Sequence, residues 1–362
     1  MNSKNPKVAV DLFAGGGGLS QGLKQAGFVV SAAVEIDPSA CATYSANHQG
    51  TVLFQTDITK ISGQELLRTS PTGQIDLIAA CPPCQGFSSL TTKYRRNDPR
   101  NELIFEFVRL VKEIRPSIIM MENVPGLAKG KGMPVFEAAM QDLTGHGYQL
   151  SHDVLDVANY GVPQHRYRLV VLGSLGKKPP TIPKPTHFRT PTNGQHSWMT
   201  VRDAIAKEDK PVSMKNAMAA GGPIQLGWNV VRELSDINIK RLMAVRPGKS
   251  RATLPVELRP ECHKNTDIGF SNVYGRMSWD DPSPTITGGC TTLSKGRFGH
   301  PSQLRTISVR EAALLQSFPR EYRFNVVHMD KVCNIIGNAL PPRFAEVMAS
   351  ACFHFIGGQS DE

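Results

Sequence analysis

No apolar run in the chain approaches the roughly 20 residues that a membrane-spanning helix needs. The N-terminal residues 1–7 are short and polar, which is unlike a secretory leader. The cysteines are odd in number and scattered: Cys41, Cys81, Cys84, Cys262, Cys290, Cys333 and Cys352. No second cysteine pair has the spacing of a zinc site, so no metal is expected. These absences indicate a cytosolic protein with free thiols and no membrane partner.

Acidic residues are fewer than basic ones, 31 against 41, and the net charge is +10. A positive balance of this size favours a polyanionic partner, nucleic acid before an anionic membrane. The length of 362 residues favours two domains.

Short apolar runs alternate with amphipathic ones in the first half of the chain. Strands are predicted at residues 7–13, 29–35, 75–80, 118–121 and 169–173, and helices at 19–26 and 104–114. This alternation predicts an α/β fold with a mostly parallel sheet and helices on both faces. Residues 174–196 are rich in proline, and residues from about 197 to 300 have weak periodicity, which indicates a smaller irregular domain. Helices at 309–316 and 344–355 are expected to pack back on the first domain.

A glycine run, Gly15–Gly18, ends the first predicted strand, and Glu35 ends the second, twenty residues after Gly15. A strand that ends in glycines before a helix lets a ligand approach the backbone, and an acid at this distance can accept ribose hydroxyls. Ser20 stands where the dinucleotide fingerprint has its third glycine. The pattern therefore favours a nucleoside without a pyrophosphate.

Three further segments lie at predicted strand ends. Residues 81–84 (Cys-Pro-Pro-Cys) follow one strand, and a thioredoxin-like redox site is an alternative interpretation of this pair. Glu122, between apolar neighbours, is expected to be buried and protonated near neutrality, and a capping or salt-bridged glutamate is the alternative interpretation. Residues 164–168 (Gln-His-Arg-Tyr-Arg) lead into another strand, where an ordinary basic strand start is the alternative.

In this order, these segments resemble the bacterial type of the DNA cytosine carbon-5 methyltransferase family. The resemblance rests on Asp11-Leu12-Phe13-Ala14-Gly15, Pro83-Cys84-Gln85, Glu122-Asn123-Val124, Gln164-x-Arg166-x-Arg168, Arg310, Leu315-Gln316-Ser317-Phe318-Pro319 and Gly337-Asn338-Ala339-Leu340-Pro341. It covers residues 7–173 and 305–355. Leu340 replaces the more usual valine, and Cys81 stands where small residues are commoner. The resemblance implies a Rossmann-like S-adenosylmethionine-dependent methyltransferase fold with a smaller target-recognition domain.

The resemblance also implies the chemistry. The Cys84 thiolate adds to carbon 6 of cytosine, which makes carbon 5 nucleophilic toward a methyl sulfonium. Protonated Glu122 donates to ring nitrogen 3, and Arg168 holds the carbonyl oxygen. Arg166 supports the loop or a phosphate. Because the target base is stacked in a duplex, it must be flipped out.

The family also suggests binding residues and domain bounds. The cofactor S-adenosylmethionine, and its product S-adenosylhomocysteine, is expected to contact Phe13, Gly15, Gly17, Gly18, Leu19, Glu35, Ile36, Asp57, Ile58, Pro83, Leu103, Asn338 and Ala339. DNA is expected to contact Gln85, Ser88, Arg100, Gln164, Thr285 and Thr287. Residues 1–173 and 305–362 would form the catalytic domain, and 174–304 the recognition domain, with Arg232, Arg246, Arg276 and Arg297 among its candidate DNA contacts.

The expected partner is double-stranded DNA, read by a monomer in the cytoplasm, at the nucleoid. A cognate restriction endonuclease that cuts the same sequence is a further expected partner. Three alternatives stay open: a transfer RNA cytosine-5 methyltransferase, a DNA-binding protein that has lost catalysis, and a thiol–disulfide oxidoreductase.

Overall fold

The computed structural model describes residues 5–83, 102–264 and 271–358. The chain forms two compact units. Unit 1 comprises Met1–Tyr160, Tyr167–Pro185 and Leu340–Glu362, and unit 2 comprises Gly161–Arg166 and Thr186–Ala339.

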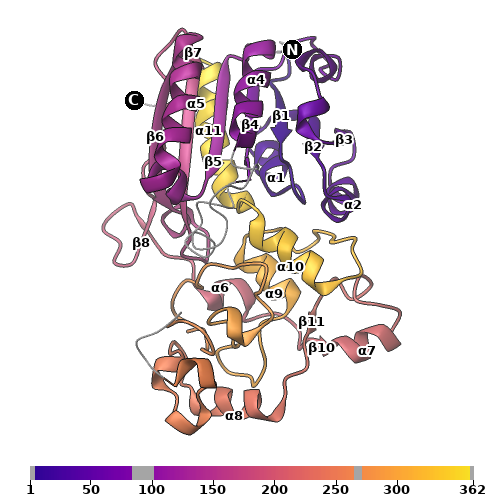
Figure 1. The fold of residues 1–362 in the computed structure, drawn as a ribbon, viewed down its shortest axis with the longest axis vertical. Helices are drawn as coiled ribbons and strands as arrows, with labels where there is room; N and C mark the ends of the chain where they lie inside the picture. Colours follow the sequence, from indigo (N-terminus) through magenta and orange to yellow (C-terminus); the bar gives the residue numbers. More distant parts are fainter. Residues whose placement is uncertain (1–4, 84–101, 265–270, 359–362) are drawn as a thin grey trace. The chain divides into compact units, whose positions relative to one another are not determined.

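Unit 1 is built on a seven-stranded sheet with the order β3-β2-β1-β4-β5-β7-β6 (Figure 1). The strands are β1 (Val8–Leu12), β2 (Val29–Glu35), β3 (Val52–Gln55), β4 (Leu77–Ala80), β5 (Ile118–Asn123), β6 (Tyr148–Asp156) and β7 (Tyr167–Leu175). The pairs from β3 to β5 are parallel, whereas β7 runs antiparallel to both β5 and β6. The mostly parallel sheet predicted from the sequence is confirmed.

Helices cover both faces of this sheet, with α4 and α5 in front and α11 behind in Figure 1. The helices of unit 1 are α1 (Gly18–Gln25), α2 (Pro38–Asn47), α3 (Gly63–Leu67), α4 (Ile104–Ile114), α5 (Met133–Gly145) and α11 (Pro342–Ile356). In α4, Ile104, Phe107, Val108 and Val111 are buried at helical spacing. Alternate β1 residues, such as Val10 and Leu12, join the same core. Asp11 therefore points to the opposite face.

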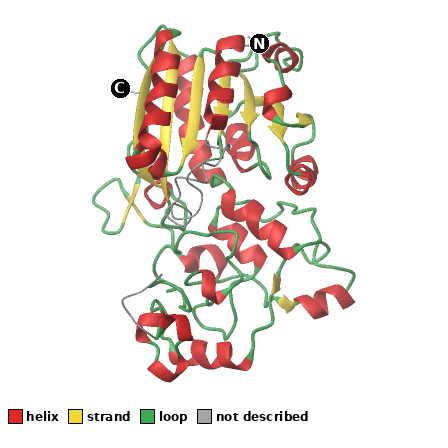
Figure 2. Ribbon diagram, viewed as in Figure 1, coloured by secondary structure: helices red, strands yellow, loops and turns green. Residues whose placement is uncertain are grey.

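Unit 2 consists mainly of loops and short helices (Figure 2). Its helices are α6 (Val201–Ile205), α7 (Met214–Ala219), α8 (Asp236–Ala244), α9 (Val309–Leu315) and α10 (Met329–Asn338). Its strands are two residues long: β8 (His187–Phe188), β9 (His196–Ser197), β10 (Val212–Ser213) and β11 (Val230–Val231). The weak periodicity of this region is thus matched by little regular structure.

One expectation about organisation needs correction. The helix predicted at 309–316 forms as α9, but it belongs to unit 2, where it packs against α6 and α10. The structural units divide the chain at other places than the expected domains, with residues 305–339 in unit 2 and 174–185 in unit 1, and the expected domain bounds stay predictions. Which residues read DNA is a separate question, and the assignment of 174–304 stays a prediction. In the part of the chain that is described, no helix has the length and apolarity to cross a membrane.

Candidate active site

The backbone after β1 turns sharply through the glycine run. Phe13 (φ 60°), Gly15 (φ 55°) and Gly17 (φ 91°) all have positive φ, a region that suits glycine and is rare for other residues. No atom of the described residues lies within 4 Å of the position that a Cβ on Gly15 would take. The loop therefore leaves open space beside its backbone, where a ligand can approach the main chain.

Glu35, at the end of β2, is held at the edge of this loop by main-chain donors. Its Oε2 accepts from the Gly15 N–H (2.8 Å), and its Oε1 accepts from the N–H groups of Ile36 (2.8 Å) and Asp37 (2.7 Å). The Ile36 side chain is 62% exposed beside it. A fixed carboxylate next to an exposed apolar side chain suits a ligand that combines hydroxyl groups with a flat ring.

The neighbouring strand brings a second carboxylate to the same edge of the sheet. The Thr56 N–H, directly after β3, donates to the Glu35 carbonyl (3.0 Å). Asp57 follows and caps a short 3-10 helix, η1 (Ile58–Lys60). The backbone N–H and the hydroxyl of Thr59 donate to Asp57 Oδ1 (3.0 and 2.9 Å) and lower the pKa of Asp57. Asp57 is therefore an anion and an acceptor at neutral pH.

Asp11, at the end of β1, is completely buried. Its Oδ2 accepts from the Ser20 hydroxyl (2.6 Å), which also bonds the Tyr44 hydroxyl (2.7 Å). Its Oδ1 has no hydrogen-bond partner among the described residues, and burial raises the pKa of Asp11 to about 7. The serine that replaces the third glycine of the dinucleotide fingerprint thus anchors this carboxyl group. Asp11 is the first residue of the motif Asp11-Leu12-Phe13-Ala14-Gly15, and nothing in its sequence position indicates this role.

Glu122 and Arg168 form a buried ion pair on neighbouring antiparallel strands, β5 and β7. Arg168 Nε lies 2.6 Å from Glu122 Oε1, and the two side chains are 13% and 8% exposed. Burial lowers the pKa of the Arg168 guanidinium, and the adjacent Glu122 carboxylate opposes that shift. The burial of Glu122 predicted from the sequence is confirmed, and the ion pair with Arg168 matches the alternative of a salt-bridged glutamate. Its role as a proton donor stays a prediction.

The start of the Cys-Pro-Pro-Cys segment is attached to the end of β5. Asn123 Nδ2 donates to the Pro82 carbonyl (3.0 Å). The Cys81 thiol, which follows β4, lies close enough to Glu122 for the carboxylate to affect its ionisation. Burial, followed by the charges of Glu122 and Asp11, raises the pKa of Cys81 well above its ordinary value. Cys81 is therefore a protonated thiol and a poor nucleophile.

Several predicted site residues lie outside the described residues: Cys84, Gln85, Ser88 and Arg100. Two predicted cofactor contacts, Pro83 and Leu103, lie on either side of the residues 84–101 that are not described. Both are half-buried.

The remaining predicted residues belong to unit 2. Arg166 is buried and donates to the carbonyls of Ile286 and Gly337 (2.9 Å each). Gln164 is completely buried, so we expect it to position this segment and not to touch DNA itself. Thr285 is exposed and donates to the His165 carbonyl (2.8 Å).

The other three unit 2 positions differ in exposure. Thr287 and Ala339 are half-buried, and Asn338, the last residue of α10, is exposed. Their predicted contacts with DNA and cofactor stay predictions.

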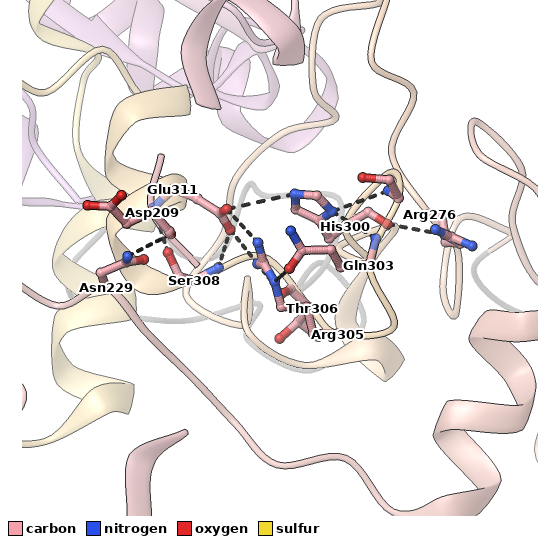
Figure 3. A network of polar contacts seen from close by, with 10 residues as sticks. Asp209, Asn229, Arg276, His300, Gln303, Arg305, Thr306, Ser308 and Glu311 are labelled. Carbon is pink, nitrogen blue, oxygen red and sulfur yellow. Dashed lines mark hydrogen bonds and ion pairs between the residues drawn. The ribbon is translucent and has the colours of Figure 1, made fainter. Parts of the chain in front are cut away.

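A polar network in unit 2 shows which basic residues are structural (Figure 3). Arg305 forms a bidentate ion pair with buried Glu311 (2.7 and 2.8 Å), and Glu311 also completes a capping box with Ser308 at the start of α9. Burial and the nearby Arg305 charge lower the pKa of His300 to about 4, so this imidazole is neutral. The Ser-x-x-Glu spacing of residues 308–311 is the sequence signal that could have revealed Glu311.

Arg276, at the edge of the same network, is buried. It donates to the carbonyls of Pro301 (2.7 Å), His300 (3.1 Å) and Leu242 (3.4 Å). Its charge is used inside the protein, so we expect no direct DNA contact from it.

The sheet order, together with a glycine loop after the first strand, defines the fold of S-adenosylmethionine-dependent methyltransferases. Residues 8–354 match the family model for C-5 cytosine-specific DNA methylases. The chain belongs to this family and is a DNA cytosine-5-methyltransferase. The predicted family is confirmed, and the thiol–disulfide oxidoreductase alternative is removed.

Full-length relatives support this assignment. The chain is 40% identical to the Type II methylase M.HgiDII of Herpetosiphon aurantiacus, over 97% of this chain and 96% of that one. It is 33% identical to the Type II methyltransferase M1.HphI of Haemophilus parahaemolyticus, over 94% and 85%.

Solved structures agree in fold. A prophage-encoded Escherichia coli protein, described as a DNA modification methyltransferase, matches with a TM-score of 0.73 at 25% identity, over 97% of this chain and 99% of that one. A Spodoptera frugiperda DNMT2 mutant matches with a TM-score of 0.63 at 18% identity, over 96% and 99%.

Proposed function

We propose that this enzyme methylates a cytosine within a specific sequence of double-stranded DNA, and that the base leaves the helix to react. The observation that carries the proposal is the buried pair of Glu122 and Arg168 at the ends of neighbouring strands. A carboxyl group and a guanidinium side by side match the edge of cytosine, which presents a ring nitrogen and a carbonyl oxygen. Such a buried site is reached only by a base outside the stack, and flipping costs a few kcal/mol.

The two side chains have separate tasks in this proposal. In the free enzyme Glu122 and Arg168 bind each other, so the incoming base exchanges this ion pair for its own contacts. Glu122 takes up a proton from solvent as the ion pair opens and donates it to ring nitrogen 3, and Arg168 holds the carbonyl oxygen. Both contacts stabilise the negative charge that develops on the ring when a nucleophile adds at carbon 6.

Cys84 is the proposed nucleophile, and its position lies outside the described residues. Its thiolate adds to carbon 6, and carbon 5 then takes the methyl group. A base removes the proton from carbon 5, the carbon–sulfur bond breaks and the Cys84 thiolate leaves. Cys81 does not compete, because its thiol stays protonated beside Glu122.

The residues of unit 1 fit S-adenosylmethionine, which supplies an electrophilic methyl group. Glu35 is fixed where it can accept ribose hydroxyls, and Gly15 leaves the backbone beside it accessible. Asp57 is an acceptor for an amino group, and Phe13 and Ile36 offer apolar surfaces for an adenine ring. The other proposed contacts are Gly17, Gly18, Leu19, Ile58, Pro83, Leu103, Asn338 and Ala339.

Target recognition is assigned to residues 174–304, with Thr285 and Thr287 as proposed DNA contacts. The relatives named Type II methylases support a place in a restriction–modification pair, in which a nuclease cuts the same unmethylated sequence. On this proposal the enzyme acts on DNA at the nucleoid.

The decisive experiment uses DNA in which 5-fluorocytosine replaces the target cytosine, incubated with enzyme and S-adenosylmethionine. Fluorine cannot leave carbon 5 as a proton does, so the wild-type protein should form an adduct that survives denaturing electrophoresis. The matched pair Cys84→Ser and Cys81→Ser separates the two thiols: the first should lose adduct and methylation, and the second should keep both.

An active wild-type enzyme that forms no adduct would refute covalent catalysis. Substantial methylation by Cys84→Ser would remove Cys84 from the mechanism. Parallel assays of methyl transfer to DNA and to transfer RNA distinguish the two substrates, and no transfer to either would favour a binding protein without catalysis.

A further inference from the structure

Two completely buried glutamines of unit 2, Gln164 and Gln316, bind each other directly. Gln164 Nε2 donates to Gln316 Oε1 over 2.6 Å. Gln164 lies in the segment that leads to Arg166, whereas Gln316 caps the C-terminus of α9, 152 residues further along the chain. Buried side-chain amides are almost always hydrogen-bonded, and the amide groups of both glutamines have partners.

The pair continues into the backbone on both sides. The Ile286 N–H donates to Gln164 Oε1 (2.7 Å), and Gln316 Nε2 donates to the Ile336 carbonyl (2.6 Å). The chain of bonds begins at a backbone donor and ends at a backbone acceptor, so only one orientation of each amide satisfies it. The two side chains therefore form one directed link from residue 286 to residue 336.

Arg166 forms a second link between the same two places. Its guanidinium donates to the carbonyls of Ile286 and Gly337, so both the N–H and the C=O of Ile286 are bound. The segment before Ile286 is also paired by two backbone hydrogen bonds. The Ser283 N–H donates to the Pro163 carbonyl, and the His165 N–H donates to the Ser283 carbonyl (2.9 Å each). Residues 283–286 are thus fixed from two directions.

We propose that Gln316 is a positioning residue for target recognition, which acts through Gln164 to hold the backbone that presents Thr285 and Thr287. The inference rests on the proposed function, because that function assigns these two threonines to DNA. Gln316 is buried and touches no DNA itself. Its loss leaves Gln164 Nε2 with the long bond to the Leu315 carbonyl (3.5 Å) and the Ile336 carbonyl without this donor. The backbone at Ile286 then gains freedom, and the enzyme discriminates less between correct and incorrect sequences.

The test compares wild-type enzyme with Gln316→Met, which keeps the length of the side chain and removes its hydrogen bonds. The full chain is assayed for kcat/KM on the target sequence and on the same DNA with one base pair changed. The ratio of the two values should fall at least tenfold in Gln316→Met. Gln225→Met, an exposed glutamine of the same unit, is the matched control and should leave the ratio unchanged.

Hydrogen exchange of the peptide that covers residues 283–290 gives a readout that needs no substrate. Exchange at Ile286 should accelerate in Gln316→Met, although its direct partner Gln164 is intact. Gln316→Glu replaces the methionine variant in this test if the latter does not fold. Glutamate keeps the shape of the side chain and the oxygen that accepts from Gln164, and in its ionised form it lacks the N–H that donates to the Ile336 carbonyl. Gln164→Met should reproduce the same loss, and the double variant should be no worse than either single one, since both belong to one link.

Unchanged exchange at residues 283–290 in a folded Gln316 variant would show that the link does not hold this segment. An unchanged specificity ratio, with accelerated exchange, would overturn the role in recognition. Failure of the proposed function looks different, because the wild-type protein itself would then methylate no DNA while its exchange pattern still reports on the link.

Discussion

At the scale of single residues, the partner of a buried side chain distinguishes the proposed catalytic residues from those that hold the framework. Glu122 and Arg168 bind each other, and in the proposed mechanism each releases the other for the cytosine. Arg166 is buried with its donors on backbone carbonyls, so its charge holds the protein together. The motif that contains both arginines therefore serves two purposes, because Arg166, just before β7, binds backbone carbonyls and Arg168, on β7, binds a carboxylate.

Asp11 allows a prediction about pH. Its pKa is about 7 in the folded protein against an ordinary 3.8, so the unfolded chain releases this proton at lower pH than the folded protein does. The folded state is therefore penalised increasingly as pH rises from about 4 to 7, and Asp11→Asn, which cannot ionise, escapes the penalty. The stability of Asp11→Asn relative to wild type should rise across this window, by on the order of 1.4 kcal/mol per pH unit.

Urea unfolding at pH 4.5, 6 and 8 measures this difference. Ser20→Ala is a useful companion, since it removes the hydroxyl that donates to Asp11 but leaves the carboxyl group titratable. Parallel stability–pH curves for wild type and Asp11→Asn would show that Asp11 ionises normally in the folded protein.

At the scale of elements, α10 packs against the 287–288 segment within unit 2. A Cβ on Gly337 would lie 2.3 Å from the Gly288 nitrogen and 2.3 Å from the Thr287 carbonyl carbon. Both are backbone atoms, which cannot turn aside as a flexible side chain does. The glycine of the Gly-Asn-Ala-Leu-Pro motif is therefore required by close packing, although glycine weakens a helix interior.

Gly337→Ala should consequently destabilise the protein by about 1–3 kcal/mol, the usual range for overpacking. Gly145→Ala in α5 is the control, because it is also helical and no described atom lies within 4 Å of its Cβ position. That variant should be neutral or more stable by up to about 1 kcal/mol. Thermal unfolding of both compares them directly, and equal stability would mean that the backbone at 287–288 yields to the added methyl group.

At the scale of the whole molecule, the net charge of +10 does not convert directly into a DNA-binding surface. Arg276 is bound to three carbonyls, Arg232 pairs with Asp330, and Arg297 donates to the Gly248 carbonyl. Arg246 is exposed and has no ion pair or side-chain hydrogen bond within the described part of the chain. Of the four arginines that the sequence nominates, Arg246 is therefore the one most available to DNA.

Arg246→Ala and Arg276→Ala should separate these roles. Arg246→Ala should keep wild-type stability and weaken DNA binding; a lost phosphate contact reduces the salt slope by about 1, and a lost base contact relaxes the target sequence. Arg276→Ala should lower thermal stability instead, because it leaves three buried carbonyls without a donor. DNA affinity at several salt concentrations and thermal unfolding test both, and a normally stable Arg276→Ala with impaired DNA binding would contradict this assignment.

The sequence by itself was sufficient for the glycine loop, the family and five of the seven strands of the sheet, but it did not predict β3 or β6. Hydrophobic periodicity located β1, β2, α4 and β5 because each buries an apolar face, which leaves a local pattern. The order of the short motifs along the chain, such as the one around Glu122, was enough to identify the family, and no knowledge of contacts between distant residues was needed. Position in sequence alone also placed Glu35 at a strand end, twenty residues after Gly15.

Partners distant in sequence were decided only by the tertiary structure. The antiparallel direction of β7 brings Arg168 to Glu122, and the packing of α9 in unit 2 brings Gln316 to Gln164. Neither contact leaves a local pattern in the sequence. A hydrogen bond between residues 152 positions apart requires a suitable side chain at each of two positions, but it produces no repeating pattern around either of them. For the same reason an arginine that binds carbonyls, such as Arg276, and one that faces solvent, such as Arg246, look alike in sequence and differ only when the surrounding backbone is in place.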